Sequence, residues 1–221
     1  MTLTIVTGAN RGIGLALVRA LVKRGDNVLA ACRKSSLELE ATGAEVLEHV
    51  DVSTPEGVER LKEAVGERSI GLLINNAGIL IWGDQIDSLQ VDGIRKQFEV
   101  NALGPLLITA ALRHRLASGS KIAFITSRMG SMGDNGSGGA YGYRMSKAAL
   151  NAAAVSVARD LASAGVAVAV LHPGMVSTEM IGGHGQIEPD AAAEGLLARI
   201  DALTIRNTGT FWHANGEELP W

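Results

Sequence analysis

Tyr143 and Lys147 stand four residues apart in the run Tyr-Arg-Met-Ser-Lys. An isolated tyrosine has a pKa of about 10, so it is poorly suited to proton transfer at neutral pH. Residues four apart lie on one face of a helix, where the ammonium of Lys147 can sit beside the phenol. A nearby positive charge lowers a tyrosine pKa and makes the phenol a usable general acid or base. The same pair also occurs on ordinary surface helices, so its meaning depends on the elements around it.

Short apolar runs alternate with longer helical patterns along the chain. We expect strands at 3–7, 27–31, 45–50, 71–74, 121–126 and 166–171, with an edge strand at 210–212. We expect helices at 14–24, 55–65, 91–117, 143–164 and 190–200. Apolar runs without alternation indicate strands that are covered on both faces. The pattern predicts an α/β fold, a Rossmann-type doubly wound parallel sheet of about seven strands with helices on both faces.

Length and composition favour one domain over residues 1–221, with a dinucleotide-binding half at 1–120 and a catalytic half at 121–221. The formal net charge of −3, without a basic tract, argues against nucleic-acid binding. No apolar run is long enough to span a membrane, and the chain enters a strand at once, so we expect a cytoplasmic protein. Cys32 is the single cysteine, and the five histidines lack metal-ligand spacing, so we expect neither a disulfide framework nor a metal site.

A glycine-rich turn, Thr-Gly-Ala-Asn-Arg-Gly-Ile-Gly at 7–14, follows the first expected strand. Its glycines allow a tight turn and the close approach of a pyrophosphate to a helix N-terminus. A P-loop for triphosphates does not fit, because no lysine followed by serine or threonine is present here. We therefore expect a dinucleotide to contact this turn, at Gly8, Asn10, Arg11, Gly12, Ile13 and Gly14.

The chain resembles the short-chain dehydrogenase/reductase family. The resemblance runs in order through the turn at 7–14, Asn-Asn-Ala-Gly at 75–78, Val-Asn-Ala at 100–102, Ile-Thr-Ser at 125–127, the Tyr143–Lys147 pair and Pro-Gly-Met-Val-Ser-Thr at 173–178. It implies four catalytic residues: Asn101, Ser127, Tyr143 and Lys147. It also implies cofactor contacts from Tyr143 and Lys147, and from Asn75, Ala77, Gly78, Pro173, Gly174, Val176 and Thr178.

The resemblance gives each catalytic residue a role. Tyr143 donates a proton to a carbonyl oxygen as hydride arrives, and Lys147 lowers the tyrosine pKa and binds the nicotinamide ribose. Ser127 holds the substrate oxygen, as a preorganised donor where negative charge develops. Asn101 anchors a water that links Lys147 to solvent.

The catalytic serine has rivals. Ser127 lies slightly further upstream of Tyr143 than is usual in the family, because extra residues fall in the glycine-rich stretch 133–140. Ser131 is therefore a second candidate, although it lies beyond the expected strand end, and Ser137 is a more distant one.

Charge at the end of the second strand bears on the cofactor. Cys32 stands where an acidic residue would hold the ribose hydroxyls of NAD, and Arg33 follows it. Arg33 can bind a 2′-phosphate bidentately, and Arg11 supplies a second positive charge. Asp51 and Val52 match the pair that contacts adenine in the family. We expect NADPH, with NAD possible, and reduction as the physiological direction.

A finer resemblance is to small carbonyl reductases of the sniffer and C-factor type, through 130–135, 141–144 and the Leu-Pro-Trp end. The segment between Thr178 and Pro189 is short and glycine-rich, so we expect a mobile lid over an open site. In the family the helix at 143–164 commonly forms a homodimer or homotetramer interface. The expected substrate is a small aldehyde or ketone, held by walls that are largely apolar: Leu80, Trp82, Arg128, Met129, Met175 and Met180.

Two other functions stay open on this sequence. One is an NAD-linked alcohol dehydrogenase that works in the oxidative direction. The other is a cofactor-binding signalling or regulatory protein of the C-factor type, in which catalysis is incidental. The intact set of four catalytic residues argues against the second, because a pure binding protein does not need all of them.

Overall fold

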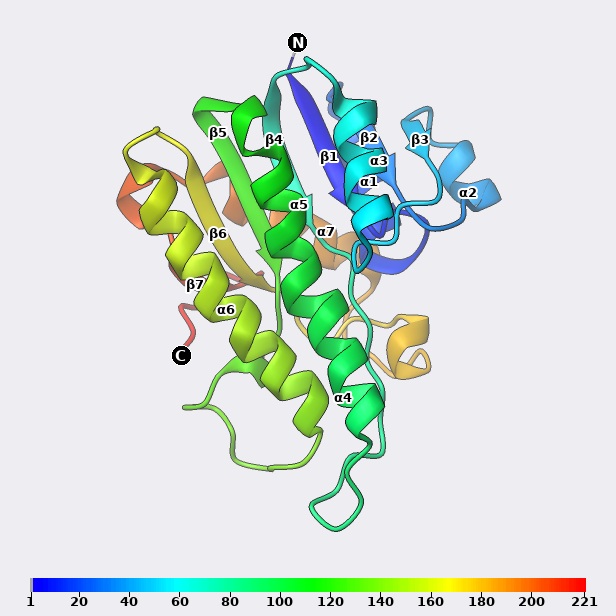
Figure 1. The fold of residues 1–221 in the computed structure, drawn as a ribbon, viewed down its shortest axis with the longest axis vertical. Coiled ribbons are helices and arrows are strands. Elements are labelled where there is room, and N and C mark those ends of the chain that lie inside the picture. Colours follow the sequence, from blue (N-terminus) through cyan, green and yellow to red (C-terminus); the bar gives the residue numbers. More distant parts are fainter. Residues whose placement is uncertain (1) are drawn as a thin grey trace.

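The computed structural model describes residues 2–221. Its centre is a seven-stranded parallel sheet in the order β3-β2-β1-β4-β5-β6-β7 (Figure 1). The strands are β1 (Leu3–Thr7), β2 (Asn27–Ala31), β3 (Glu45–Leu47), β4 (Ile70–Asn75), β5 (Leu116–Ile125), β6 (Ala167–His172) and β7 (Phe211–His213). The strand order reverses between β1 and β4, and ligands of such sheets bind outside the carboxyl ends at that point. The predicted doubly wound sheet is confirmed.

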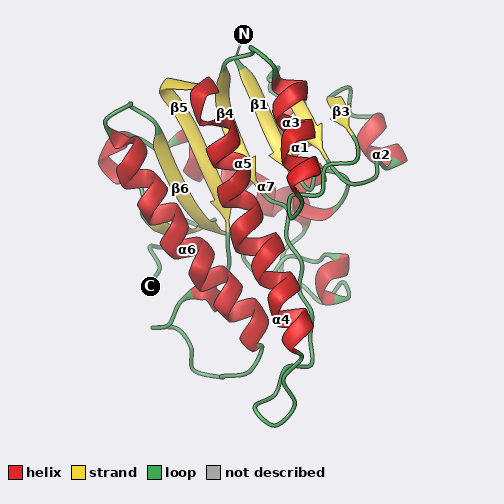
Figure 2. Cartoon of the chain, in the orientation of Figure 1, coloured by secondary structure: helices red, strands yellow, loops and turns green. Residues whose placement is uncertain are grey.

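Helices cover both faces of this sheet (Figure 2). They are α1 (Gly12–Lys23), α2 (Leu37–Glu40), α3 (Pro55–Val65), α4 (Val91–Phe98), α5 (Gly104–Leu112), α6 (Tyr141–Ala162) and α7 (Pro189–Asp201). Residues of α3, α5 and α6 pack in one hydrophobic core, and residues of α1 and α7 pack in the other. The long α4–α5 run and α6 extend past the carboxyl ends of the strands (Figure 1). They therefore form one wall of the space into which the strand ends point.

Alternation along each strand divides its side chains between the two cores. In β1, Leu3 and Ile5 belong to the core under α3, α5 and α6, whereas Val6 belongs to the core under α1 and α7. All five residues of β1 are buried. Two-sided burial explains why the strands appear in the sequence as continuous apolar runs rather than alternating ones.

The prediction of a single helix at 91–117 is wrong. The structure divides it into α4, a π-helical turn (Glu99–Leu103), α5 and a short 3₁₀ turn (Arg113–Arg115), after which β5 begins at Leu116. Pro105 has no N–H to donate to the carbonyl of Asn101, so a regular α-helical bond is missing at this point. Single π turns inside helices are frequent at functional sites.

Other element boundaries differ by a few residues. The third strand was expected to reach residue 50, but β3 ends at Leu47, and His49 has φ of 63°, which an extended strand cannot contain. The sequence did not predict α2, a four-residue helix capped by Ser36. At the expected sheet edge, Leu219 is buried and Trp221 stacks on Phe211 with ring centroids 5.4 Å apart.

Within residues 2–221, none of the helices has both the length and the apolar composition that crossing a bilayer requires.

Candidate active site

A cleft of about 910 Å³ opens at the carboxyl ends of β1, β2, β4, β5 and β6. It is lined by the glycine turn after β1, the 76–82 segment after β4, the 126–129 segment after β5 and the 173–181 segment after β6. In Figure 1 these strand ends and loops meet in the lower half of the molecule, beside α4 and α6. All the predicted site residues line this cleft except Asn75 and Asn101.

The glycine turn leaves no room for side chains. Gly8 has φ of 65°, and a Cβ added to it would lie 2.8 Å from the Cα of Ala77. A Cβ on Gly14 would lie 2.2 Å from the carbonyl oxygen of Gly8. The turn therefore packs its own backbone against the loop after β4, and this close packing needs glycine.

The N-terminus of α1 is suited to an anion. It has no side-chain cap and no acidic residue in its first turn, whereas α3 is capped by the hydroxyl of Thr54. The uncapped residues Gly12, Ile13 and Gly14 line the cleft. Unpaired amides and the helix dipole at such an end bind phosphate groups. The residues of this end of the cleft therefore fit the pyrophosphate of a dinucleotide.

The expected position of Asn75 in the cofactor cleft is wrong, because Asn75 does not line the cleft. Its side chain is buried and donates to the hydroxyl of Thr109 on α5 at 3.2 Å. The next residue, Asn76, lines the cleft instead, and its amide donates to the carbonyl oxygens of Thr7 at 2.9 Å and Gly8 at 3.2 Å. Adjacent residues at a strand end point to opposite sides, and a shift of one position exchanges core for cleft. Asn76 thus holds the glycine turn in place.

Tyr143, Ser127 and Lys147 all line the cleft and lie close to one another. Ser127 lies two residues after β5, at the start of the 3₁₀ turn Arg128–Gly130, and its side chain is beside the phenol of Tyr143. The Ser127 Oγ also accepts the amide hydrogen of Met129 at 3.1 Å, which leaves its O–H to donate. Lys147 lies one helical turn beyond Tyr143, with Nζ 5.8 Å from the centre of the phenol ring. The predicted helical pairing is confirmed as geometry.

The prediction that Lys147 lowers the pKa of Tyr143 is wrong. Burial raises the pKa of Tyr143 to about 12, although the hydrogen bond with Ser127 lowers it. The Nζ of Lys147 donates to the carbonyl oxygen of Ile125 at 3.0 Å, so one of its hydrogens is engaged by the backbone. Burial lowers the pKa of Lys147 to about 8. The ammonium therefore loses its proton far more easily than an exposed lysine does.

Asn101 lies behind the cleft, on the π-helical turn, and is fully buried. Its Oδ1 accepts the amide hydrogen of Ile79 at 2.8 Å, and its Nδ2 donates to the carbonyl of Ile79 at 2.8 Å and to the hydroxyl of Ser146 at 3.0 Å. These bonds join the loop after β4 to the helix that carries Tyr143 and Lys147. The structure gives Asn101 a positioning role, and its role as a water anchor stays a prediction.

The structure separates the three candidate serines. Ser127 lines the cleft, whereas Ser131 is buried outside it and accepts the amide hydrogen of Asp134 at 3.0 Å. Ser137 is exposed and does not line the cleft. Of the three, only Ser127 is placed to touch a molecule bound there.

A carboxylate that sequence reasoning missed fixes the start of α6. Asp84 is buried after β4, and its Oδ2 accepts the amide hydrogen of Gly142 at 3.1 Å. Its Oδ1 accepts the amide hydrogen of Gln90 at 3.0 Å. Negative charge at a helix N-terminus is stabilising, and this contact lies one residue from Tyr143. The residue comes from a distant segment, so no local sequence signal could identify it.

The adenosine end of the cleft has Arg33, Asp51 and Val52 on its walls, as expected. The Oδ1 of Asp51 accepts from the amide and the hydroxyl of Ser53 at 2.9 and 2.6 Å. Burial opposes ionisation of Asp51, but these hydrogen bonds together with the charges of Lys96 and Arg33 outweigh it and lower its pKa. Cys32 is buried here, and burial with the nearby charge of Glu48 raises its pKa to about 11, so the thiol is a neutral wall of the pocket.

The substrate end of the cleft is mixed in character. The expected walls Leu80, Trp82, Met129, Met175 and Met180 line it. Arg128 is also there, paired with Glu217 at 2.7 Å and with Asp134 at 3.4 Å.

Sequence reasoning did not place Asp134 or Arg144 in the cleft, yet both line it. His172, which precedes Pro173 at the end of β6, lines it too. Burial, with help from His213 and Arg128, lowers the pKa of His172 to about 3, so this imidazole is neutral at physiological pH.

The short segment after β6 folds back over the cleft. A 3₁₀ turn (Glu179–Ile181) leads into it, and the amide of Ser177 donates to the carbonyl of Ile187 at 2.8 Å. Glu179 pairs with Arg11, so the segment after β6 is joined to the glycine turn. Its mobility stays a prediction.

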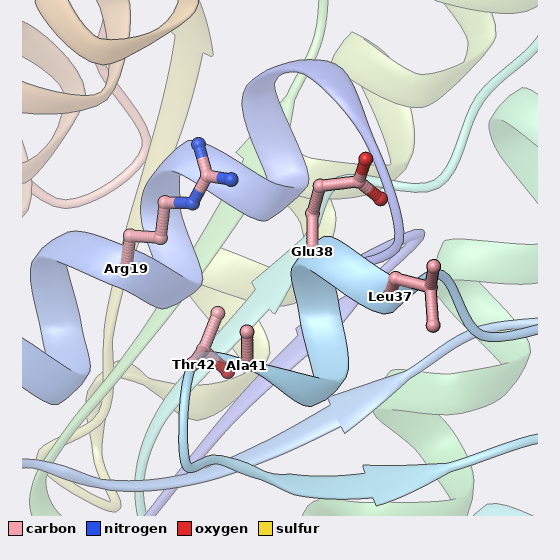
Figure 3. Close-up of a pocket in the computed structure, with 5 residues that line it drawn as sticks. All are labelled: Arg19, Leu37, Glu38, Ala41 and Thr42. Carbon is pink, nitrogen blue, oxygen red and sulfur yellow. The ribbon is translucent and has the colours of Figure 1, made fainter.

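A separate hollow of about 400 Å³ lies between α1 and α2 (Figure 3). Arg19 reaches it from α1 and Glu38 from α2, with Leu37, Ala41 and Thr42 as the remaining walls. None of the predicted site residues lines it. Unlike the larger cleft, it has no glycine turn and no predicted catalytic residue along its walls.

Comparison with known proteins agrees with this geometry. A family profile described as short chain dehydrogenase matches residues 2–187. The chain is 43% identical to 1-hydroxy-2-glutathionyl-2-methyl-3-butene dehydrogenase of Rhodococcus sp. (strain AD45), with 100% of both proteins covered. It is 40% identical to C-signal of Myxococcus xanthus over 154 residues, which cover 69% of this chain and 93% of that protein.

Two solved structures have the same fold over the whole chain. The carbonyl reductase Sniffer of D. melanogaster superposes with a TM-score of 0.90 at 27% identity, covering 100% of this chain and 99% of that one. The NADPH-bound carbonyl reductase from chicken fatty liver superposes with a TM-score of 0.89 at 28% identity, covering 100% and 98%. The expected resemblance to sniffer and C-factor proteins is confirmed. On its profile, its relatives and its sheet, the chain belongs to the short-chain dehydrogenase family.

Proposed function

We propose that this protein uses NADPH to reduce a small aldehyde or ketone to an alcohol. The observation that carries the proposal is that the two ends of one cleft suit two different chemical groups. An uncapped helix N-terminus and Arg33 line one end, and a buried tyrosine beside Ser127 lies at the other. The first end suits a phosphorylated dinucleotide, and the second suits a carbonyl oxygen that gains a proton.

The chain's own groups hold the cofactor in this proposal. The amides of Gly12, Ile13 and Gly14 bind the pyrophosphate, and Arg33 binds the 2′-phosphate, as a fork of donors matched to phosphate oxygens. Asp51 accepts from the adenine amino group, and Lys147 binds the nicotinamide ribose. When bound, NADPH supplies a hydride to the carbonyl carbon.

Protonation of the substrate oxygen is the work of Tyr143. The phenol donates its proton to the oxygen, and the Ser127 O–H donates a hydrogen bond to the same atom. Lys147 then stabilises the phenolate and returns a proton to it, which its pKa of about 8 allows near neutral pH. Asn101 keeps α6 and the loop after β4 in register, so that these groups stay aligned.

Preference for NADPH is supported by Cys32 and Arg33. A buried neutral thiol replaces the carboxylate that would repel a 2′-phosphate, and the guanidinium beside it attracts one. The NADPH-bound state of the chicken carbonyl reductase agrees with this assignment.

A second candidate is the oxidation of an alcohol that carries a glutathionyl group, with NAD as acceptor. The Rhodococcus relative is named for this class of substrate, and it matches the chain over the full length of both proteins. A signalling role, as the name of C-signal indicates for that protein, is a third candidate.

The test is a panel of small aldehydes and ketones assayed with NADPH and with NADH, together with the dissociation constant of each cofactor. The proposal predicts turnover of several carbonyls and tighter binding of NADPH than of NADH. Tighter NADH binding with turnover of alcohols alone would favour the second candidate. Tight cofactor binding with no turnover of either class would favour the third.

A further inference from the structure

Two arginines that line the cleft have no carboxylate partner within residues 2–221: Arg33 at the adenosine end and Arg144 at the substrate end. The other arginines of the cleft are neutralised, Arg11 by Glu179 and Arg128 by Glu217 and Asp134. The proposed function gives Arg33 the 2′-phosphate of NADPH. The proposed function gives Arg144 no negatively charged partner.

The contacts of Arg144 are neutral and mostly long. Its Nε donates to the carbonyl of Gly138 at 3.3 Å, its Nη1 to the carbonyl of Met129 at 3.4 Å, and its Nη2 to the hydroxyl of Ser137 at 2.9 Å. Hydrogen bonds above about 3.2 Å are weak, and neutral acceptors do not offset a full charge. The guanidinium is thus held at the cleft, but no negative group neutralises its charge.

Its position relates it to the reacting centre. Arg144 follows Tyr143 directly in α6, and Met129, whose carbonyl it contacts, follows Ser127 by two residues. Apolar side chains of Trp82 and Met175 line the same cleft. A substrate with its carbonyl at Tyr143 therefore has apolar surface beside it and a cation within the same pocket.

The loop that Arg144 contacts can adjust to a ligand. Gly136, Gly138 and Gly139 have open space around them, since a Cβ at any of them would meet nothing within 4 Å. There is therefore room beside these glycines for the loop to shift when Arg144 exchanges its long bonds for a stronger acceptor.

We propose that Arg144 binds an anionic group, a carboxylate, on the substrate. This inference rests on the proposed function and narrows it: the natural substrate class is a carbonyl compound, or the alcohol formed from it, that carries a carboxylate separated from the reacting carbon by an apolar spacer. Arginine is suited to this role, because its planar fork binds a carboxylate through two parallel hydrogen bonds. Arg144 is a specificity-determining residue and takes no part in hydride or proton transfer.

The test compares matched pairs of substrates that differ only in charge. The pairs are 4-oxobutanoate, 6-oxohexanoate and 8-oxooctanoate, each assayed with NADPH beside its own methyl ester. We expect kcat/KM for at least one acid to exceed that of its ester by roughly ten- to hundredfold, as for a hydrogen bond to a charged group. Arg144→Gln should lower kcat/KM of the acid by about this factor and that of its ester far less, so that the preference is lost.

Three control variants separate recognition from loop structure. Ser137→Ala removes the shortest loop contact of Arg144 and keeps the charge, so the acid preference should survive. Arg144→Lys should restore part of it. Arg159→Gln, an exposed arginine on the same helix, should change nothing. Retained NADPH binding shows that each variant is folded.

Equal losses for acid and ester in Arg144→Gln would overturn the inference and leave Arg144 as a loop contact. A wild-type enzyme that reduces esters as well as acids would overturn it too, without touching the proposed function. If no carbonyl is reduced, the proposed function fails separately. The inference is then tested by binding of 6-hydroxyhexanoate and its methyl ester to the NADP⁺ complex, where equal affinities would overturn it.

Discussion

The two ends of the cleft differ in whether backbone or side chains determine their shape. At the cofactor end the backbone sets the shape, since a Cβ on Gly8 or Gly14 would overlap backbone atoms. At the substrate end the shape comes from side chains on loops, and Gly136 and Gly138, in the neighbouring loop outside the cleft lining, have no atoms within 4 Å of an added Cβ. One end is therefore rigid and closely packed, and the other is open to change.

This difference teaches where specificity resides. A shared cofactor needs one geometry, which glycines and strand ends hold fixed. Substrates differ among proteins of one fold, so their contacts come from loops that can vary without cost to the sheet. The four predictions below separate chemistry at the substrate end from binding at the cofactor end.

The largest effect is expected for Tyr143→Phe. Loss of the phenolic proton donor should lower kcat by roughly 10²–10⁴-fold, the usual contribution of a general acid. The NADPH dissociation constant, measured by calorimetry, should change little, because the phosphate contacts lie at the other end. A parallel loss of binding and turnover would show that the two ends are not separable.

Gly14→Ala should disturb the rigid end. Its Cβ would lie 2.2 Å from the carbonyl oxygen of Gly8 and 2.6 Å from the amide nitrogen of Asn76, so the turn must move. We expect chemical denaturation to show a loss of about 1–3 kcal/mol in the free energy of unfolding, together with weaker NADPH binding. The matched control is Gly136→Ala at the open end, which should alter neither quantity. Equal effects of the two variants would refute the contrast.

The pH dependence of stability should report the burial of Lys147. Its pKa is about 8 in the folded protein and about 10.5 in the unfolded chain, so the unfolded chain binds more protons between these values. The free energy of unfolding should therefore gain about 2 kcal/mol from this group as pH rises from 8 to 10, and lose it as pH falls back through 8. The slope should flatten in Lys147→Met. An unchanged slope would place the titration elsewhere.

The smallest effect is expected for Arg33→Gln. Arg33 is exposed at the cofactor end, so loss of its contact with a 2′-phosphate should weaken NADPH binding by about tenfold and leave NADH binding unchanged. Lys34→Gln, an exposed neighbour that does not line the cleft, is the control. If NADPH and NADH affinities fell together, Arg33 would not be the residue that selects the phosphate.

Much of the sheet could be predicted from the sequence. The bounds of β1, β2 and α3 agree with those expected, because buried strands appear as unbroken apolar runs and Thr54 and Pro55 mark a helix start. The π-helical turn at Asn101 and the early start of β5 were missed. The π-helical turn continues the helical pattern of its neighbours, and β5 begins in Leu-Ala-Ser-Gly-Ser at 116–120, which lacks the apolar run that marks a buried strand.

The site divides in the same way. The residues expected to bind the cofactor were chosen through local motifs, and all of them except Asn75 line the cleft. Asn75 was misplaced because one residue at a strand end decides between core and cleft. Asp84 and Arg144 were missed because their roles depend on contacts between distant segments. The pKa of Tyr143 could not be foreseen either, since the spacing of Tyr143 and Lys147 does not reveal that the phenol is buried.

The central claim is that this cleft transfers hydride from NADPH to a carbonyl carbon. The direct measurement uses NADPH labelled with deuterium at one of the two C4 positions, and mass spectrometry of the alcohol that is formed. The account predicts that one of the two labelled forms passes its deuterium to the product in full, with one NADPH consumed per alcohol. Tight NADPH binding with no deuterium in the product from either form, for every carbonyl tried, would contradict it.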